Sequence, residues 1–224
     1  MGNATLQNFM KNMPIFAKLT AQEQILLLEN TRRVKFEKGK VIHAGYEDCT
    51  GIIIIINGVL KSFILSEEGR EITLYRMYDN EICLLSASCV LEAINVDIFV
   101  SAEEETEAYI IDAEICKGIM EKNIYLENYA LNLVVTRFGM IMDVFKKILF
   151  LSFDKRLATF LKEEADKNSN RRINYTHEQI ASYVGSSREV VSRKLRQFAD
   201  EGLVKVTRNS IEILDYQSLS RLVD

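Results

Sequence analysis

The chain has 224 residues, of which 48% are hydrophobic and 27% are charged, and its formal net charge at pH 7 is −4. This composition is typical of a soluble globular protein, and the length suits one medium and one small domain, each with its own core. No apolar run approaches the roughly 20 residues that span a bilayer, so we expect no membrane partner.

The N-terminal segment, MGNATLQNFMKNMPIF, lacks both the charged region and the continuous apolar region of a signal peptide. We therefore expect the protein to be cytoplasmic. Thr20 and Glu23 then form a capping box ahead of apolar residues at helical spacing. This pattern predicts a short helix at about residues 20–30.

From residue 31 to residue 111 the sequence consists of short β-branched runs separated by turn residues. Four stretches are typical of strands: VKFEKGKVIHAG, TGIIIIINGVLKSFIL, SEEGREITLYRM and FVSAEEETEAYIID. The clearest hairpin signals are Asn57-Gly58 and Glu68-Gly69. Several short strands at nearly regular spacing predict a compact all-β sandwich or barrel.

One long helix is predicted at about residues 121–150. Its apolar residues alternate spacings of four and three, as in the heptad seam of a helix that packs on a partner helix, and they form a candidate dimer interface: Leu131, Val135, Phe138, Met142, Phe145 and Leu149. Val134, Ile141 and Ile148 run beside this seam, so we expect the helix also to pack on the β-domain. The alternative is a helix buried wholly within one chain.

The balance of charge changes after this helix. Residues 1–150 contain 15 basic and 21 acidic side chains, whereas residues 151–224 contain 13 basic and 11 acidic ones. A mildly basic end on an acidic body indicates that only this end meets a polyanion.

The stretch THEQIASYVGSSREVVSRKLRQFADEGLVKV contains two helix starts separated by one turn. Thr176 and Gln179 form a capping box for a short helix, and Gly185 permits a sharp turn. Ser186 or Ser187 can then cap a second helix that runs to about residue 200. Two helices joined by a glycine-containing turn predict a helix-turn-helix.

The second helix has two unlike sides at 3.6 residues per turn. Val191, Leu195 and Phe198 fall on one side, which must pack on the domain. The opposite side carries groups suited to the edges of DNA bases: Glu189, Ser192, Arg193 and Arg196. The alternative is that Glu189 and Arg193, four residues apart, form only a surface salt bridge.

Other residues of this region are candidate contacts to the DNA backbone. Arg188 is placed to touch a phosphate or a flanking base, and we assign Thr176, Ser186 and Ser187 to the same surface. The following stretch, GLVKVTRNSIEIL, predicts two short strands about a turn near residues 208–210. This β-wing would lay its basic tip along the phosphate backbone.

At this point the chain resembles, over essentially its full length, the Crp/Fnr family of bacterial transcription regulators. The matching features are PIFAKLT, FEKGKVIHAGYEDCTGIIIIINGVLKSFIL, the long helix, and HEQIASYVGSSREVVSRKLRQFADEGLV. The resemblance implies an α+β fold in three parts. They are an N-terminal sensor domain, a jelly-roll-like β-roll, at 1–120, a dimerisation helix at 121–150, and a C-terminal winged helix-turn-helix at 151–224.

The resemblance also implies a homodimer on double-stranded DNA with a palindromic operator, and RNA polymerase as a further partner. The family's positions for reading bases fall here on Arg188, Glu189, Ser192 and Arg193. This combination is similar to that of the fumarate-nitrate type of regulator, which implies half-sites with a TGA-like core.

The effector is the open part of the resemblance. Family members that bind cyclic AMP hold its phosphate with an arginine about ten residues after a Gly-Glu pair. Here Glu81 follows an asparagine, and no Arg or Lys lies between Arg76 and Lys117. Because a buried phosphodiester without a positive partner is costly, we predict that cyclic nucleotides are not bound in the usual way. We expect instead a small neutral or cationic effector, held by Ser86 and Ser88 and balanced by Glu81.

No cofactor is identified from the sequence. Cys49, Cys83, Cys89 and Cys116 show no CxxC spacing, so we expect four buried or half-buried thiols. A redox, iron–sulfur or haem sensor of the same family is the alternative, with His43 as the haem ligand to consider.

Two other classes of protein are less well supported. An enzyme on a β-barrel needs a cluster of His and carboxylate ligands, but the two histidines, His43 and His177, lie in different predicted domains. We therefore predict no enzymatic activity. A β-barrel that only binds other proteins would leave the outward Arg193 and Arg196 unexplained.

Overall fold

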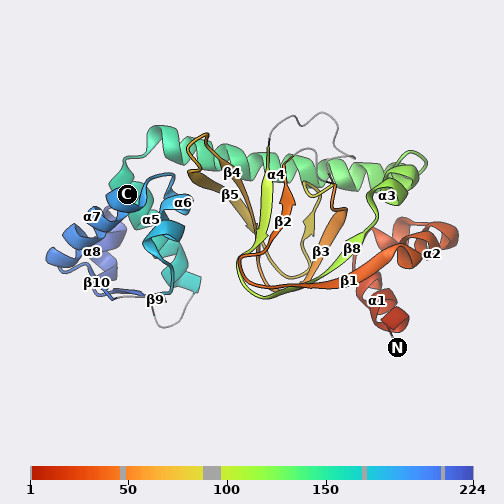
Figure 1. The fold of residues 1–224 in the computed structure, drawn as a ribbon, viewed down its shortest axis with the longest axis horizontal. Helices are drawn as coiled ribbons and strands as arrows, with labels where there is room; N and C mark the ends of the chain where they lie inside the picture. The colour runs from red at the N-terminus through yellow and green to blue at the C-terminus, as the bar shows by residue number, and fades with distance from the viewer. Residues whose placement is uncertain (1, 46–48, 88–96, 168–170, 208–209, 224) are drawn as a thin grey trace. The chain divides into compact units, whose positions relative to one another are not determined.

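The computed structural model shows two compact units (Figure 1). The described residues are 2–45, 49–87, 97–167, 171–207 and 210–223. The first unit comprises residues 1–64 and 75–140, and the second comprises residues 65–74 and 141–224. Within the described ranges, no helix has both the length and the apolar character needed to cross a membrane.

Three short helical segments precede the first strand: α1 (Gly2–Lys11), η1 (Phe16–Lys18) and α2 (Ala21–Glu29). The predicted capping box of α2 is confirmed, since Thr20 Oγ1 accepts from the Glu23 N–H and the Glu23 carboxylate accepts from the Thr20 N–H at 2.7 Å. The sequence did not predict α1. Its polar surroundings obscure Leu6 and Met10, which are buried in the core of the first unit.

The strands of the β-roll form two four-stranded sheets, in the orders β1-β8-β3-β6 and β2-β7-β4-β5 (Figure 1). Their bounds are β1 (Thr31–Phe36), β2 (Val41–Ala44), β3 (Ile52–Asn57), β4 (Leu60–Leu65), β5 (Glu71–Met77), β6 (Ile82–Cys83), β7 (Phe99–Ala102) and β8 (Thr106–Ile111). The all-β architecture predicted for this region is therefore confirmed.

The isoleucine run of β3 lies between β8 and β6 in the middle of its sheet. Ile52 and Ile54 belong to the core that the helices cover, whereas Ile53 and Ile55 point to the opposite face and are fully buried. Successive side chains of a strand alternate between faces. A strand that is apolar at every position is consequently one that is buried on both faces.

The turn at Asn57-Gly58 does not close a hairpin, so this prediction was wrong. β3 pairs with β8 and β6, whereas β4 pairs with β7 in the other sheet. The chain crosses between sheets at Gly58, whose φ of 117° favours glycine. A Cβ there would lie 2.6 Å from Thr106 Oγ1. The turn at Gly69 does join neighbouring strands, β4 and β5, as predicted.

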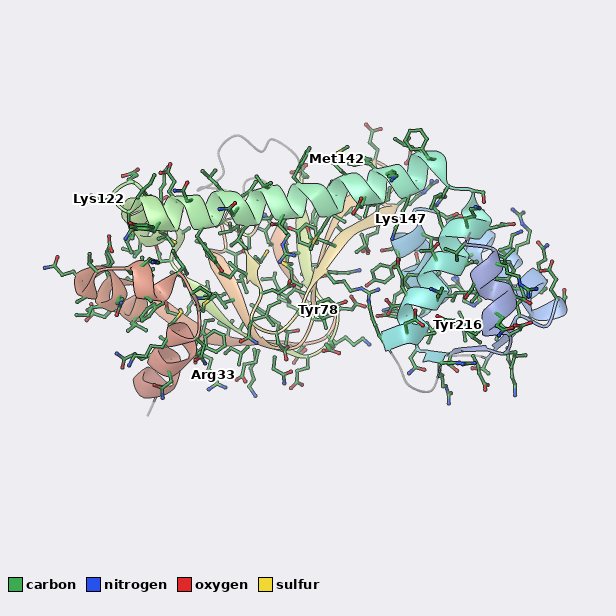
Figure 2. All side chains as sticks on the ribbon, turned by 180° about the vertical axis from the view of Figure 1, so that it is seen from behind. Arg33, Tyr78, Lys122, Met142, Lys147 and Tyr216 are labelled. Carbon is green, nitrogen blue, oxygen red and sulfur yellow. The ribbon has the colours of Figure 1, made fainter. Side chains whose placement is uncertain are left out.

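Two helices follow β8. The sequence did not predict α3 (Ala113–Met120), which begins where the Asp112 carboxylate accepts from the Ile115 N–H at 3.1 Å. The predicted long helix is α4 (Ile124–Phe150), which Figure 2 shows as one unbroken helix that starts beside Lys122 and passes Met142 and Lys147. One side of α4 packs on the core of the first unit through residues such as Leu126 and Leu133.

The second unit is built from short elements: α5 (Phe153–Lys167), β9 (Arg172–Ile173), α6 (His177–Val184), α7 (Arg188–Asp200), β10 (Val204–Val206), β11 (Ile211–Ile213) and α8 (Tyr216–Arg221). Its three strands have the order β10-β11-β9. The predicted wing corresponds to β10 and β11, and β9 lies where the sequence predicted only a loop. Residues 65–74 join this unit at Ser182, whose hydroxyl donates to Glu71 Oε1 at 2.6 Å.

The cysteines do not all have the predicted state. Cys83 and Cys116 are free and buried, and burial raises the pKa of both thiols. Cys49, however, is disulfide-bonded, which corrects the expectation of four thiols. Cys89 lies outside the described residues. In the part of the chain that the structure describes, no group of three or more His, Cys, Asp or Glu residues could hold a metal ion.

Candidate nucleic-acid interface

The N-terminal end of α6 and the turn after it have the predicted local chemistry. Thr176 Oγ1 accepts from the Gln179 N–H at 3.2 Å, and Gln179 Oε1 accepts from the Thr176 N–H at 2.9 Å. Gly185 ends α6 with a left-handed φ of 61°. Of the two candidate caps for α7, the structure selects Ser187, whose hydroxyl accepts from the Val190 N–H.

The faces of α7 are as the sequence predicts. Val191, Leu195 and Phe198 are buried in the core of the second unit, at 2% exposure or less. Arg188, Glu189, Arg193 and Arg196 are exposed, and Ser192 is half-buried beside them. The helix is thus anchored by three apolar side chains and turns its charged side outward.

The charged groups of this side are not consumed by pairing on the helix. Within the described chain, Glu189 and Arg193 make no ion pair with each other, and Arg196 makes none either. Lys194 differs, because its ammonium lies 2.8 Å from the Asp154 carboxylate of α5. Backbone hydrogen bonding at the start of α7, followed by the Ser187 hydroxyl, lowers the pKa of Glu189, so this carboxylate stays ionised. The surface salt bridge between Glu189 and Arg193 is therefore absent.

A groove of about 490 Å³ separates the starts of α6 and α7 from the wing. Its lining mixes hydroxyl, imidazole, carboxylate and guanidinium groups: Thr176, His177, Glu178, Arg188, Thr207 and Ser210. Hydroxyl and guanidinium groups are the donors that commonly contact DNA phosphates. The groove therefore has the chemistry of a backbone contact next to the base-reading face of α7.

The wing is braced from within. The Thr207 N–H donates to the Ser210 carbonyl at 2.8 Å, and the two hydroxyls lie 2.8 Å apart. Arg172 of β9 donates to Ser210 Oγ at 3.0 Å. The predicted basic tip, at residues 208–209, lies outside the described residues.

Two contacts in this unit were not predicted from the sequence. His177 Nδ1 lies 2.7 Å from Ser192 Oγ, which ties the first residue of α6 to the base-reading face of α7. Arg156 of α5 donates to the carbonyls of Val184 at 2.8 Å and Leu151 at 2.7 Å. A guanidinium at these two positions satisfies carbonyls where helices end, and its positive charge opposes the negative end of the helix dipole.

The predicted effector residues are only partly brought together. Ser86 is fully buried, and its hydroxyl donates to the carbonyls of Gly51 at 2.7 Å and Cys83 at 3.1 Å. Ser88 lies outside the described residues. Glu81 accepts from the Tyr78 N–H at 2.9 Å, and its carboxylate also lies near a cation that the sequence search missed.

That cation is Arg137 of α4, which is 9% exposed. Its guanidinium lies 3.6 Å from the Glu81 carboxylate and 4.9 Å from the centre of the Tyr75 ring. The search for a positive partner covered only residues near Glu81 in the sequence. The overlooked signal was an arginine three residues after Val134 and four before Ile141, on the inward stripe of the long helix.

The fold and the outward face of α7 define the class of the protein, a DNA-binding protein with a winged helix-turn-helix. The Crp-like helix-turn-helix domain family matches residues 155–222. A solved transcriptional regulator of the Crp/Fnr family from Eubacterium rectale is 42% identical, with a TM-score of 0.91 over 96% of this chain and 99% of that chain. The chain belongs to the Crp/Fnr family of DNA-binding transcription regulators.

More distant relatives differ in what they are named for. The cyclic AMP receptor protein of Thermus thermophilus is 24% identical over 95% of this chain and 98% of its own length. Electron transport regulator A of Shewanella oneidensis is 26% identical over 85% of this chain and 78% of its own length. These relatives are transcription regulators and not enzymes, which agrees with the prediction.

Proposed function

We propose that the protein is a homodimeric regulator that binds a palindromic operator with one α7 helix in each half-site. The observation that carries this proposal is the outward face of α7, where the Glu189 carboxylate and the Arg193 guanidinium make no ion pair with each other in the described chain. Arginine can fork to guanine, and glutamate can accept from cytosine. We assign base reading to Glu189, Ser192 and Arg193.

The backbone contacts are proposed for the residues around the groove and the start of α7. They are Arg188, Thr176, Ser186 and Ser187, with Arg196 on the exposed side of the helix. Thr176 and Arg188 line the groove itself. Because its DNA partner lies in the cytoplasm, we place the protein there, and we propose RNA polymerase as the partner through which it acts on transcription.

The dimer is supported by the outer side of α4. All six residues of the predicted seam are large, apolar and exposed: Leu131 55%, Val135 67%, Phe138 62%, Met142 48%, Phe145 45% and Leu149 70%. A continuous exposed apolar stripe on one helix requires a covering partner, and its heptad spacing fits the same stripe of a second copy. Two recognition helices must reach successive major grooves roughly 34 Å apart, which a dimer permits.

For the effector, we propose a small neutral or cationic molecule at Glu81 in the β-roll. A cationic group there would compete with Arg137 for the carboxylate and so release one contact between α4 and the β-roll. Ser86 is engaged with backbone carbonyls, so its hydroxyl serves this region from within the protein. Isothermal calorimetry should detect no tight binding of cyclic AMP, and micromolar binding would contradict this proposal.

The test of DNA reading is a comparison of Arg193→Ala with the wild type. Operators are first selected from random-sequence DNA, and binding is then measured by gel shift on selected and scrambled duplexes. Loss of a bidentate base contact should reduce the preference for the selected duplex by about 5- to 150-fold. Arg221→Ala, on α8, which packs on α5, is the charge-matched control. Unchanged selectivity in Arg193→Ala would count against base reading.

A further inference from the structure

The hydrogen bond between His177 and Ser192 joins a titratable ring to a base-reading hydroxyl. His177 is the first residue of α6 and is half-buried, and its Nδ1 lies 2.7 Å from Ser192 Oγ on α7. The distance is that of a well-formed hydrogen bond. The ring also lines the groove beside the wing, so it faces the space where DNA is proposed to lie.

A serine hydroxyl has one proton and two lone pairs, and the direction of its proton depends on its partner. If His177 is neutral with its proton on Nε2, then Nδ1 is an acceptor and Ser192 donates to it. The serine oxygen then offers only lone pairs to DNA. In the major groove it can accept from the amino groups of cytosine or adenine.

Protonation of the ring reverses this arrangement. Both ring nitrogens of an imidazolium are donors, so Nδ1 donates to Ser192 and the hydroxyl proton becomes free. Ser192 can then donate to guanine O6 or N7, or to thymine O4. The same side chain would thus recognise opposite hydrogen-bonding groups in the two states.

We propose that His177 is a positioning residue for base reading: it fixes whether Ser192 presents a lone pair or a proton to the DNA, and so makes the base preference at that position depend on pH. The proposal rests on the proposed operator binding by α7. It adds a residue outside α7 to the determinants of specificity.

The surroundings of the ring set the pH range. Burial, and after it the positive charge of Arg188, lower the pKa of His177 from its usual value of 6.5. The charged groups that line the groove with it are Arg188 and Glu178. A lowered pKa keeps the ring neutral at pH 7, so the acceptor state of Ser192 prevails there, and the donor state is expected below pH 6.5. A DNA phosphate in the groove would move this change toward higher pH.

The experiment selects operators from random-sequence DNA at pH 7.5 and at pH 5.5, with the wild type, Ser192→Ala and His177→Phe. The position read by Ser192 is the one whose preference is lost in Ser192→Ala. At that position the wild type should favour cytosine or adenine at pH 7.5 by about 2- to 10-fold, the effect of one hydrogen bond, and lose or reverse this preference at pH 5.5. His177→Phe keeps an aromatic ring without a titrating nitrogen, so its preference should be weak and equal at both pH values.

Two further measurements separate the possible failures. His177→Asn, which retains hydrogen-bonding atoms near the place of Nδ1 but does not titrate, should recover part of the affinity of His177→Phe and show no pH dependence. The preference at the Arg193 position should not change between the two pH values, because guanidinium does not titrate there. A wild type that selects an operator with the same preference at both pH values would overturn this inference alone, whereas failure to select any operator would overturn the proposed function.

Discussion

At the scale of single residues, Gly185 decides the geometry of the helix-turn-helix. Its φ of 61° lies in the left-handed region, and a Cβ at this position would sit 2.8 Å from Ile148 Cδ1. The end of an isoleucine side chain can move, so the backbone conformation is the larger obstacle. The carbonyl of the preceding residue, Val184, is held by Arg156, which leaves the turn little freedom to adjust.

Gly185→Ala should therefore destabilise the second unit by about 1–2 kcal/mol, the cost of a left-handed conformation for a residue with a Cβ. Thermal unfolding of the full chain followed by circular dichroism would show a lower midpoint. Gly118→Ala in α3 is the matched control, because nothing lies within 4 Å of its added Cβ. A helical Gly→Ala change should stabilise by about 0.5–1 kcal/mol. Equal effects of the two substitutions would refute this role for Gly185.

At the scale of elements, local signals predicted what is local. The capping boxes at Thr20 and Thr176 each start the helix that the sequence assigned to them, because a cap needs only residues three positions apart. Pairing between strands is not local, and the hairpin expected at Asn57-Gly58 failed for this reason. The contact between Arg137 and Glu81 spans 56 positions and depends on how α4 packs, which no spacing within one segment could reveal.

The two sides of α4 illustrate the same distinction in one element. Heptad spacing predicted the outer stripe, and the exposure of its six residues leaves them available to a partner helix. The inner side packs on the first unit through Val134 and its neighbours, as the second apolar stripe predicted. One helix pattern thus anticipated both contacts, but not the arginine between the inner apolar residues.

Phe138→Ala should weaken self-association, since Phe138 is 62% exposed in the single chain and lies at the centre of the seam. Each copy would lose the burial of an aromatic side chain, worth about 1.5–3 kcal/mol, so the dimer dissociation constant should rise by at least about 100-fold. Sedimentation equilibrium measures this directly. Tyr125→Ala, on the same helix and 58% exposed but off the seam, should leave association unchanged. A Phe138→Ala protein that associates as tightly as the wild type would exclude the seam as the interface.

At the scale of the whole molecule, the distribution of charge separates the partner-binding end from the body. The net charge is −4, yet residues 151–224 carry two more basic than acidic side chains. The excess is small, so the unit does not attract DNA through bulk charge. Its basic groups must act through position, with Arg188 in the groove and Arg193 on the exposed face of α7.

Arg188→Ala should therefore change the salt dependence of operator binding in a countable way. Each phosphate contact releases counterions that contribute about 0.9 to the slope of log K against log salt concentration. Losing one contact in each protomer of a dimer should reduce the magnitude of the slope by about 2, measured by fluorescence anisotropy from 50 to 300 mM salt. Lys194→Ala removes a neighbouring cation that is already paired with Asp154, so its slope should match that of the wild type. Because both variants lower the net charge equally, a difference between them reports the position of Arg188 and not the overall charge, and equal slopes in all three proteins would place Arg188 away from the phosphates.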